Sequence, residues 1–359
     1  QALRRTPRSK AITQENRAHL ADPRTVQGFR KQWKEIVYPL VSERAKGSRI
    51  WDVDGNEYID LVNGYGVTFF GHSPDFIVDA VRAELDRTIA IGPQTPLAGE
   101  VAKLVCELTG MERAAFCNTG SEAVLAAIRV ARTVTGRTKL ATFAGHYHGI
   151  FDEVLVKGAG TGAERRPVPI APGIPPSKVA DVIVMEYDNL ESLDVIRRHA
   201  DDIALVLVEP VRSRNLDRQP VQFLRALRKL TEELGIPLLF DEMITGFRSH
   251  PGGAQALFGV RADIATYGKV IGGEFPIGVV AGRKEYLDAL DGGMWSYGDD
   301  SAPDADMTWF AGTFVRHPIA LAAAKAALTR LKEEGPGLQS GLTASPQGSL
   351  SRASNRERV

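Results

Sequence analysis

Residues 237–278 read PLLFDEMITGFRSHPGGAQALFGVRADIATYGKVIGGEFPIG, and this stretch decides which fold the rest of the chain adopts. The apolar run LLF is typical of a buried parallel strand, and Asp241 and Glu242 follow at its carboxyl end, where open α/β sheets bind their ligands. Residues 262–267 form a second strand-like run. Lys269 comes directly after it, among glycines that permit close approach of the backbone. The stretch therefore predicts an acid and a lysine at the ends of two separate strands.

Strand-like and helical segments alternate through most of the chain. Apolar residues recur at helical spacing in residues 76–86, 97–108, 122–135, 190–199, 221–234 and 318–331. Short apolar runs indicate strands at residues 114–117, 139–143, 182–185 and 203–208. This alternation predicts an α/β fold with a doubly wound, mainly parallel sheet. Residues 158–176 are rich in Gly and Pro, and we interpret them as an irregular surface excursion.

The two ends of the chain differ from this pattern. Residues 1–30 are polar and rich in arginine, and we interpret them as a basic arm or linker. Further on, two strand-like runs flank Asp54-Gly55-Asn56, which predicts a hairpin in a small β unit. Residues 336–359 show no sustained period and are dominated by Ser, Gly and Arg, so we predict a disordered tail.

The composition excludes several classes of protein. Lys plus Arg (44) equals Asp plus Glu (44) in the 359 residues, so no net charge favours nucleic acid or an anionic membrane. No apolar run is long enough to span a membrane, and no signal-peptide pattern follows the basic start. Cys106 and Cys117 lie in apolar surroundings, which predicts buried free thiols and fits a reducing cytoplasm, the location we expect.

Lys269 and Asp241 indicate a function only when they are considered together. A desolvated lysine becomes a neutral amine that can form a Schiff base with an aldehyde, although a loop lysine more often faces solvent. A carboxylate beside a pyridine nitrogen keeps that nitrogen protonated and makes pyridoxal 5′-phosphate (PLP) an effective electron sink. The alternative for Asp241 is the cap of a following helix. Together the two residues suggest opposite ends of one cofactor.

Other residues fit the same cofactor-binding hypothesis, although each also has an interpretation that involves no cofactor. Residues 118–121 (Asn-Thr-Gly-Ser) precede a helix and can bind a phosphate, although many helices start this way. Tyr147, between two histidines in a glycine-flanked loop, can stack on a planar cofactor. Those histidines lack a nearby acid or thiol, which argues against a metal site. Glu209 follows a strand-like run, where it can act as a further site acid or simply belong to the turn that ends the strand. Arg30 can bind a substrate carboxylate or face solvent.

Six motifs occur in a fixed order between about residues 20 and 335: NTGSEA, GHYHG, VEP, DEMITGFR, TYGKVIGGEFPIG and AGTF. This series resembles the class III PLP-dependent aminotransferases of fold type I, most nearly those akin to glutamate-1-semialdehyde aminomutase. The segments HLADPRTVQGFR, KEIVYPL and FAGTFVRHPIALAAAKAAL further resemble aminotransferase domains of hybrid polyketide and nonribosomal peptide synthases.

The resemblance implies two catalytic residues and a set of cofactor contacts. Lys269 would form the internal aldimine and later move a proton between the substrate Cα and the cofactor. Asp241 would pair with the pyridinium nitrogen, Tyr147 would stack on the ring, and Met243 would pack on its opposite face. The predicted cofactor contacts also include His148 and Glu209.

The resemblance also implies how the phosphate and the substrate are bound. Gly120 and Ser121 would bind the phosphate of the same chain's cofactor. Thr313 would reach the phosphate of a neighbouring subunit, which implies a homodimer with shared active sites. Arg30 would hold a substrate carboxylate, and Tyr65 would line the substrate pocket.

Domain limits follow from the same comparison. We predict residues 31–70 as the N-terminal part of a small domain, 71–310 as the large PLP-binding domain and 311–335 as the start of a C-terminal small domain. The family continues through a further lobe that this sequence lacks, which we interpret as a truncation, a frameshift or a fragment boundary. Such a loss would expose an apolar face.

The predicted function is amino transfer from an amino-acid donor to a carbonyl acceptor. The second resemblance suggests a β-ketoacyl chain on an acyl or peptidyl carrier protein as that acceptor. The alternative within the same enzyme class is a glutamate-1-semialdehyde-type 2,1-aminomutase. An alternative from another class is an inactive, truncated scaffold or docking module.

Overall fold

The computed structural model describes residues 2–338, and the predicted tail lies outside the described residues from position 339 onward. The chain divides into two compact units, Gln1–Val78 and Asp79–Val359. Each unit has its own sheet. The finer domain limits predicted from the sequence stay a proposal.

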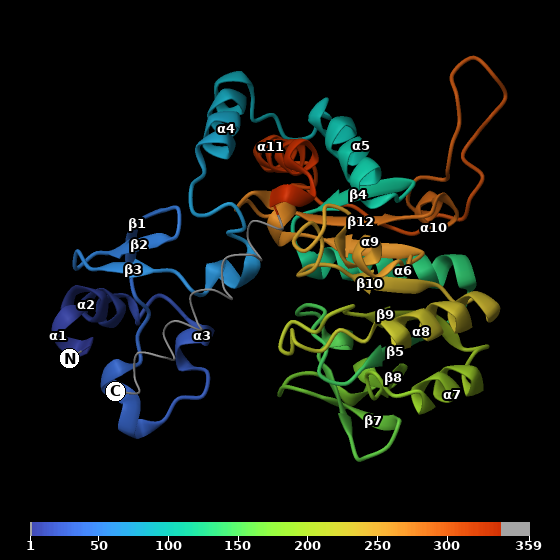
Figure 1. Ribbon diagram of the computed structural model, residues 1–359, viewed down its shortest axis with the longest axis horizontal. Coiled ribbons are helices and arrows are strands. Elements are labelled where there is room, and N and C mark those ends of the chain that lie inside the picture. Colours follow the sequence, from blue (N-terminus) through green and yellow to red (C-terminus); the bar gives the residue numbers. More distant parts are fainter. Residues whose placement is uncertain (1, 339–359) are drawn as a thin grey trace. The chain divides into compact units, whose positions relative to one another are not determined.

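The first unit packs short helices beside a small antiparallel sheet (Figure 1). The sheet order is β1 (Ser42–Lys46), β2 (Arg49–Asp52) and β3 (Glu57–Ile59). The predicted hairpin at residues 54–56 is confirmed, because β2 and β3 pair antiparallel around it. Asp54 accepts hydrogen bonds from the backbone N–H groups of Arg8 and Ser9, so the arginine-rich segment is tied to the hairpin. Its helical elements are α1 (Ala2–Arg5), α2 (Pro7–Asn16), α3 (Pro23–Val26), η1 (Lys31–Ile36) and η2 (Asn63–Gly66).

The second unit is built on one nine-stranded sheet, which Figure 1 shows with its strands side by side. The spatial order is β4 (Arg113–Cys117), β12 (Gly278–Gly282), β11 (Ile264–Tyr267), β10 (Leu238–Asp241), β9 (Ile203–Val208), β5 (Lys139–Phe143), β8 (Val182–Met185), β7 (Glu164–Pro169) and β6 (Val156–Ala159). The central strands β11, β10, β9, β5 and β8 are parallel. β12 and β7 run in the opposite direction. The predicted α/β class and mainly parallel sheet are confirmed.

All six predicted helical segments are found as helices. The α-helices are α4 (Asp75–Arg87), α5 (Leu97–Thr109), α6 (Gly120–Thr135), α7 (Glu191–Arg198), α8 (Val221–Glu233), α9 (Gly253–Phe258), α10 (Lys284–Leu287) and α11 (Pro318–Glu334). The 3₁₀ turns are η3 (Asp152–Val154), η4 (Pro176–Val179), η5 (Lys269–Gly272) and η6 (Asp288–Leu290). α6 packs across β9, β11 and β12, and its buried alanines let the helix approach the strands closely.

The prediction of an irregular excursion over residues 158–176 is wrong in its first part. β6 and β7 extend the sheet there, and β7 pairs antiparallel with β8. β6 is the edge strand and β7 lies between it and β8. Both strands are partly exposed, so they lack the continuous apolar run of the central strands. Their prolines suggested irregular backbone, but β7 pairs with β8 only at Glu164 and Arg165, whereas Pro167 and Pro169 pair with β6 alone. A strand tolerates proline where one of its sides has no ladder partner.

Two smaller predictions concern cysteines and membranes. Cys106 and Cys117 are free thiols, as predicted, with Cys117 buried and Cys106 half-buried. Across residues 2–338, no helix combines the length and the apolar character needed to cross a bilayer.

Candidate active site

The candidate site lies at the carboxyl edge of the parallel strands. β10 ends at Asp241, β9 is followed by Glu209, and β11 is followed by Gly268 and Lys269. β5 runs into the loop of residues 144–149. Because β11, β10, β9 and β5 are consecutive neighbours in the sheet, these residues emerge beside one another.

Asp241 is a buried carboxylate held in place by three donors. Its Oδ2 lies 2.8 Å from Nδ1 of His148, which is itself buried. Its Oδ1 accepts the backbone N–H of Met243 at 3.1 Å and lies 3.5 Å from the hydroxyl of Thr266. A carboxylate that lacks a proton can only accept, so His148 Nδ1 carries the proton in this pair. The side chain of Asp241 is therefore fixed in orientation.

Glu209 joins the end of β9 to the neighbouring loop. Its Oε2 accepts the backbone N–H of Tyr147 at 3.0 Å, and its Oε1 accepts that of Ser213 at 3.2 Å. Its own backbone N–H donates to Nδ1 of His146 at 3.1 Å. Burial raises the pKa of Glu209, and burial lowers the pKa of His146 well below its usual value. His146 is thus a neutral acceptor that helps to hold the loop.

Lys269 has two unusual properties. Its backbone lies in the left-handed region with φ of 50°, a conformation that costs a non-glycine residue about 1–3 kcal/mol and that clusters at functional sites. Burial lowers the pKa of its ε-amine, while the carboxylates of Asp241 and Glu209 act in the opposite direction. The positive charge of Arg248 adds to the lowering. The amine is therefore neutral at a lower pH than the amine of an exposed lysine.

The turn before α6 has the form of an anion site. Thr119 caps the helix, and the Glu122 carboxylate accepts the backbone N–H groups of Asn118 and Thr119 at 2.7 and 2.9 Å. Among residues 2–338, no acceptor takes a hydrogen bond from the backbone N–H of Gly120 or Ser121. These two donors remain available at the positive end of a 16-residue helix.

Met243 lies between this turn and the lysine. A Cβ added to Gly120 would lie 2.6 Å from its sulfur, and a Cβ added to Gly268 would lie 2.7 Å from it. The Met243 side chain therefore packs closely against both glycines and would have to shift if either carried a Cβ. The arrangement links the predicted phosphate turn to the residue before Lys269.

The remaining predicted residues lie in separate places. Tyr147 is 47% exposed. Thr313 lies on the exposed segment before α11 and lines a cavity with Gly312. Arg30 and Tyr65 belong to the first unit, where Arg30 stacks over Trp33 with 4.9 Å between its guanidinium carbon and the ring centroid. The roles of all these residues stay predictions.

The sequence did not indicate two participants that the structure reveals. Thr266 reaches Asp241 because the two residues are paired in the register of β10 and β11. Ser213 binds Glu209 through a turn four residues further on. Knowing that β10 and β11 are neighbours would have indicated Thr266, whereas the turn at Ser213 has no sequence signal.

Comparisons with known proteins agree with this geometry. The family model described as "Aminotransferase class-III" matches residues 31–342. A glutamate-1-semialdehyde 2,1-aminomutase from Persephonella marina is 39% identical over 301 residues, which cover 83% of this chain and 67% of the relative.

Solved structures show the same similarity. An omega-transaminase from Sphaerobacter thermophilus has a TM-score of 0.80 at 31% identity and covers 90% of this chain and 72% of its own. A β-phenylalanine aminotransferase from Variovorax paradoxus has a TM-score of 0.77 at 29% identity, with 94% and 72% covered.

Proposed function

This chain belongs to the class III aminotransferases, and from that membership we propose that Lys269 and Asp241 are its catalytic pair in amino-group transfer. The cofactor is pyridoxal 5′-phosphate. The observation that carries the proposal is a buried, oriented carboxylate and a lysine of lowered pKa at one edge of a sheet.

The residues present fit this cofactor. The free N–H groups of Gly120 and Ser121 suit its phosphate, and the oriented carboxylate of Asp241 suits its pyridine nitrogen. A Cβ at Gly120 or Gly268 would lie within 3 Å of the Met243 sulfur, so the Met243 side chain packs closely against both glycines. When bound, PLP supplies an electron sink for negative charge on the substrate carbon next to the amino nitrogen.

Lys269 is proposed to act as both base and acid. Its lowered pKa increases the fraction of neutral Nζ near neutral pH, and a neutral amine can accept a proton from the substrate carbon. The resulting ammonium is stabilised by the carboxylates of Asp241 and Glu209 until it returns the proton. One side chain can therefore serve both directions of the reaction.

Asp241 is proposed to hold a protonated ring nitrogen. A buried carboxylate stabilises an adjacent positive charge more strongly than an exposed one, because water screens it less. The Nδ1–H of His148 and the backbone N–H of Met243 keep the carboxylate from rotating. His148 is a positioning residue in this proposal.

For the substrate, the aminomutase reaction is the first candidate. The curated relatives carry the name glutamate-1-semialdehyde 2,1-aminomutase, and they support this reaction better than transfer to a carrier-bound chain. In that reaction the amino group moves between adjacent carbons of one small molecule.

Transfer between two molecules is the second candidate. The solved structures with the same fold include an omega-transaminase and a β-phenylalanine aminotransferase, and their names favour a separate amino donor and acceptor. A β-ketoacyl chain on a carrier protein remains the acceptor suggested by the sequence resemblance alone.

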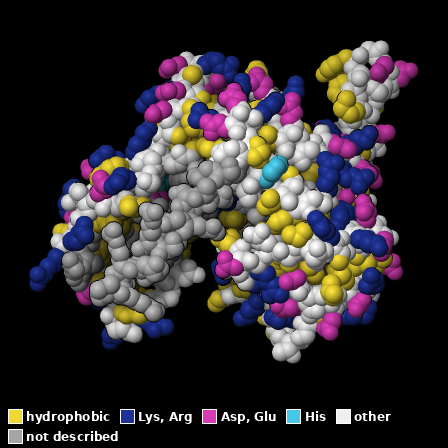
Figure 2. All heavy atoms as spheres, in the orientation of Figure 1, with side chains coloured by type: hydrophobic (Ala, Val, Ile, Leu, Met, Phe, Trp, Pro, Cys, Tyr) yellow, Lys and Arg dark blue, Asp and Glu magenta, His cyan; other side chains and the backbone are white. Residues whose placement is uncertain are grey.

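A homodimer with shared sites is proposed as the working assembly. The segment between α10 and α11 projects as a long loop in Figure 1, and Figure 2 shows hydrophobic side chains on it. Its exposed large side chains are Met294, Trp295, Tyr297, Met307, Trp309 and Phe314. Clusters of this kind mark surfaces that another protein covers. Sedimentation velocity distinguishes the dimer from a monomer.

Two assays with PLP-loaded protein test the proposed function. The first supplies glutamate 1-semialdehyde alone, and the second supplies an amino-acid donor with a β-keto thioester. We expect turnover in the first assay, and turnover in the second alone would favour the transaminase candidate. Lys269→Ala should abolish both reactions, whereas Lys103→Ala, at a lysine 79% exposed on α5, should change neither. Loaded protein that catalyses neither reaction would support the inactive scaffold.

A further inference from the structure

Two histidines of the loop after β5 each have a buried ring nitrogen that lacks a partner. Nε2 of His146 and Nε2 of His148 are buried, and neither forms a hydrogen bond with any residue that the structure describes. The centroids of the two rings lie 5.8 Å apart. A buried polar atom has lost its hydrogen bonds to bulk water, so native proteins rarely leave one unsatisfied. Both nitrogen atoms therefore require a partner beyond the described side chains.

The other nitrogen of each ring decides where the proton lies. Nδ1 of His146 accepts the backbone N–H of Glu209 at 3.1 Å, so this atom carries no proton. Burial lowers the pKa of His146 well below its usual value, so the ring is neutral and its one proton is on Nε2. In His148, Nδ1 donates to Asp241 at 2.8 Å, which leaves Nε2 of a neutral ring as an acceptor. One unpaired nitrogen is thus a donor and the other is an acceptor.

A single water molecule between the rings would satisfy both atoms. The two Nε2 atoms do not bond to each other directly. Two successive hydrogen bonds of about 2.9 Å through a water join atoms up to about 5–6 Å apart, which suits this pair of rings. The water would accept from Nε2–H of His146 and donate to Nε2 of His148. Buried waters typically make about three hydrogen bonds to polar atoms that otherwise lack partners.

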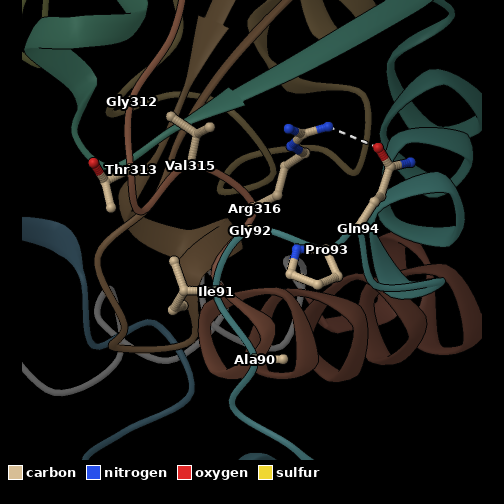
Figure 3. A pocket seen from close by; sticks show the side chains of 9 residues that line it. All are labelled: Ala90, Ile91, Gly92, Pro93, Gln94, Gly312, Thr313, Val315 and Arg316. Atoms are coloured by element: carbon tan, nitrogen blue, oxygen red, sulfur yellow. Dashed lines mark hydrogen bonds between the residues drawn. The ribbon is translucent and has the colours of Figure 1, made fainter.

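Arg212 brings a third buried donor to the same loop. Its Nε is buried and has no hydrogen-bond partner among residues 2–338. A Cβ added to Gly145 would lie 3.2 Å from its Nη1, so the guanidinium lies against the residue before His146. Elsewhere an amide satisfies such a donor, since Nη1 of Arg316 donates to Oε1 of Gln94 at 2.7 Å (Figure 3). Nε of Arg212 is available as a second donor to the water.

The charges around the two rings make the state of His148 important. Asp241 accepts from its Nδ1, and the ring also acts to lower the pKa of Glu209. On the other side, the positive charge of Arg212 disfavours a second proton on His146. An imidazolium at His148 would compensate the charge of Asp241, whereas a neutral ring leaves that charge available. A hydrogen bond donated to Nε2 is compatible only with the neutral ring, because an imidazolium has no lone pair there.

We propose that His146 is a positioning residue that acts through one buried water and holds His148 in its neutral form, with the proton on Nδ1. The carboxylate of Asp241 then keeps its negative charge for the pyridine nitrogen of PLP. This consequence rests on the proposed function, whereas the proton pattern of the two rings does not.

Two substitutions separate the roles of the two nitrogen atoms of His146. His146→Asn places an amide oxygen near the position of Nδ1, so the acceptor for the Glu209 N–H is kept and the Nε2 donor is lost. His146→Gln places an amide N–H near the position of Nε2 and loses the Nδ1 acceptor. His250→Asn is the matched control, because Nδ1 of His250 also accepts a backbone N–H, that of Gly252 at 2.9 Å.

Nitrogen NMR of protein with isotope-labelled histidine shows which ring nitrogens carry protons. The chain has seven histidines, and loss of a signal in His148→Gln assigns that residue. In the PLP-free wild type we expect protons on Nδ1 of His148 and on Nε2 of His146. His146→Asn should place a proton on Nε2 of His148, whereas His146→Gln and His250→Asn should keep the wild-type pattern.

Activity of the PLP-loaded protein is the second measurement, with a substrate that wild type turns over. We expect kcat of His146→Asn to fall about tenfold, which is the contribution of about one hydrogen bond. His146→Gln should stay within about threefold of wild type, and His250→Asn should match wild type.

The proposal is overturned if Nε2 of His148 carries a proton in the wild type, or if folded His146→Asn leaves the proton pattern of His148 unchanged. Equal losses of kcat in His146→Asn and His146→Gln would also overturn it, because they would show that His146 only anchors the loop. A wild-type protein without turnover refutes the proposed function, yet the proton pattern of the PLP-free protein still decides the role of His146.

Discussion

Gly278→Ala places a methyl group where the structure leaves no room for one. Gly278 begins β12 and pairs with Cys117 of β4. An added Cβ would lie 2.1 Å from the carbonyl oxygen and 2.6 Å from the carbonyl carbon of Thr119. These are backbone atoms, so no side-chain rotation relieves the collision. β12 and the turn must separate by roughly 1 Å to restore ordinary contact.

The expected loss in the free energy of unfolding is the sum of two contributions. Forcing one extra methyl group into a packed site destabilises a protein by about 1–3 kcal/mol. Thr119 also caps α6, and disturbing such a cap adds about 0.5–2 kcal/mol. The sum is about 1.5–5 kcal/mol, which corresponds to a fall in melting temperature of roughly 3–20 °C at about 2–4 °C per kcal/mol. Displacement of Gly120 and Ser121 should also weaken PLP binding.

Differential scanning calorimetry of the PLP-free protein measures the first effect, and PLP titration measures the second. Gly99→Ala is the matched control, because a Cβ there meets nothing within 4 Å and the residue lies within α5. Alanine should raise stability at that position by about 0.5–1 kcal/mol. If Gly278→Ala melts at or above the wild-type temperature, the close approach of β12 to the helix cap is refuted.

Three further predictions concern buried ionisable groups. Burial lowers the pKa of Lys269 in the folded chain, so between that lowered value and the ordinary 10.5 the unfolded chain binds a proton that the folded chain has released. The free energy of unfolding therefore rises with pH across this window. Lys269→Met should remove this rise, measured by urea denaturation of the PLP-free protein. Glu242→Gln puts an amide where a carboxylate accepts the N–H groups of Ala254 and Gln255, so chemical denaturation at pH 7 should show a loss of about 1–3 kcal/mol, and a loss below 0.5 kcal/mol would contradict the assignment. Asp241→Asn should lower kcat by more than about a hundredfold with an unchanged circular dichroism spectrum, and retained activity would refute its role.

Much of the fold was predictable because the central strands are buried on both faces. β9 and β10 are buried at every position and therefore appear as continuous apolar runs in the sequence. β6 and β7 escaped prediction because partly exposed strands carry mixed polarity. The spatial order was also beyond sequence reasoning, since β12 inserts between β4 and β11, which are distant in the chain.

The candidate site was likewise predictable only in part from the sequence. The positions of Asp241, Glu209 and Lys269 at the sheet edge could be predicted because each ends or follows a recognisable strand. Their roles stay predictions. Contacts that join distant segments could not be predicted. His148 binds Asp241 across 93 positions, and Arg316 binds Gln94 across 222. Local patterns carry no information about which loops meet in space.

The most direct test of the central claim is chemical trapping of PLP on the protein. Wild type and Lys269→Ala are mixed with PLP, reduced with borohydride, digested and analysed by peptide mass spectrometry. A Schiff base between Lys269 and PLP becomes a stable amine on reduction, so wild type should carry a phosphopyridoxyl group on Lys269 and the variant should carry none at that position. A label on another lysine, or no label on folded wild-type protein, would contradict the account.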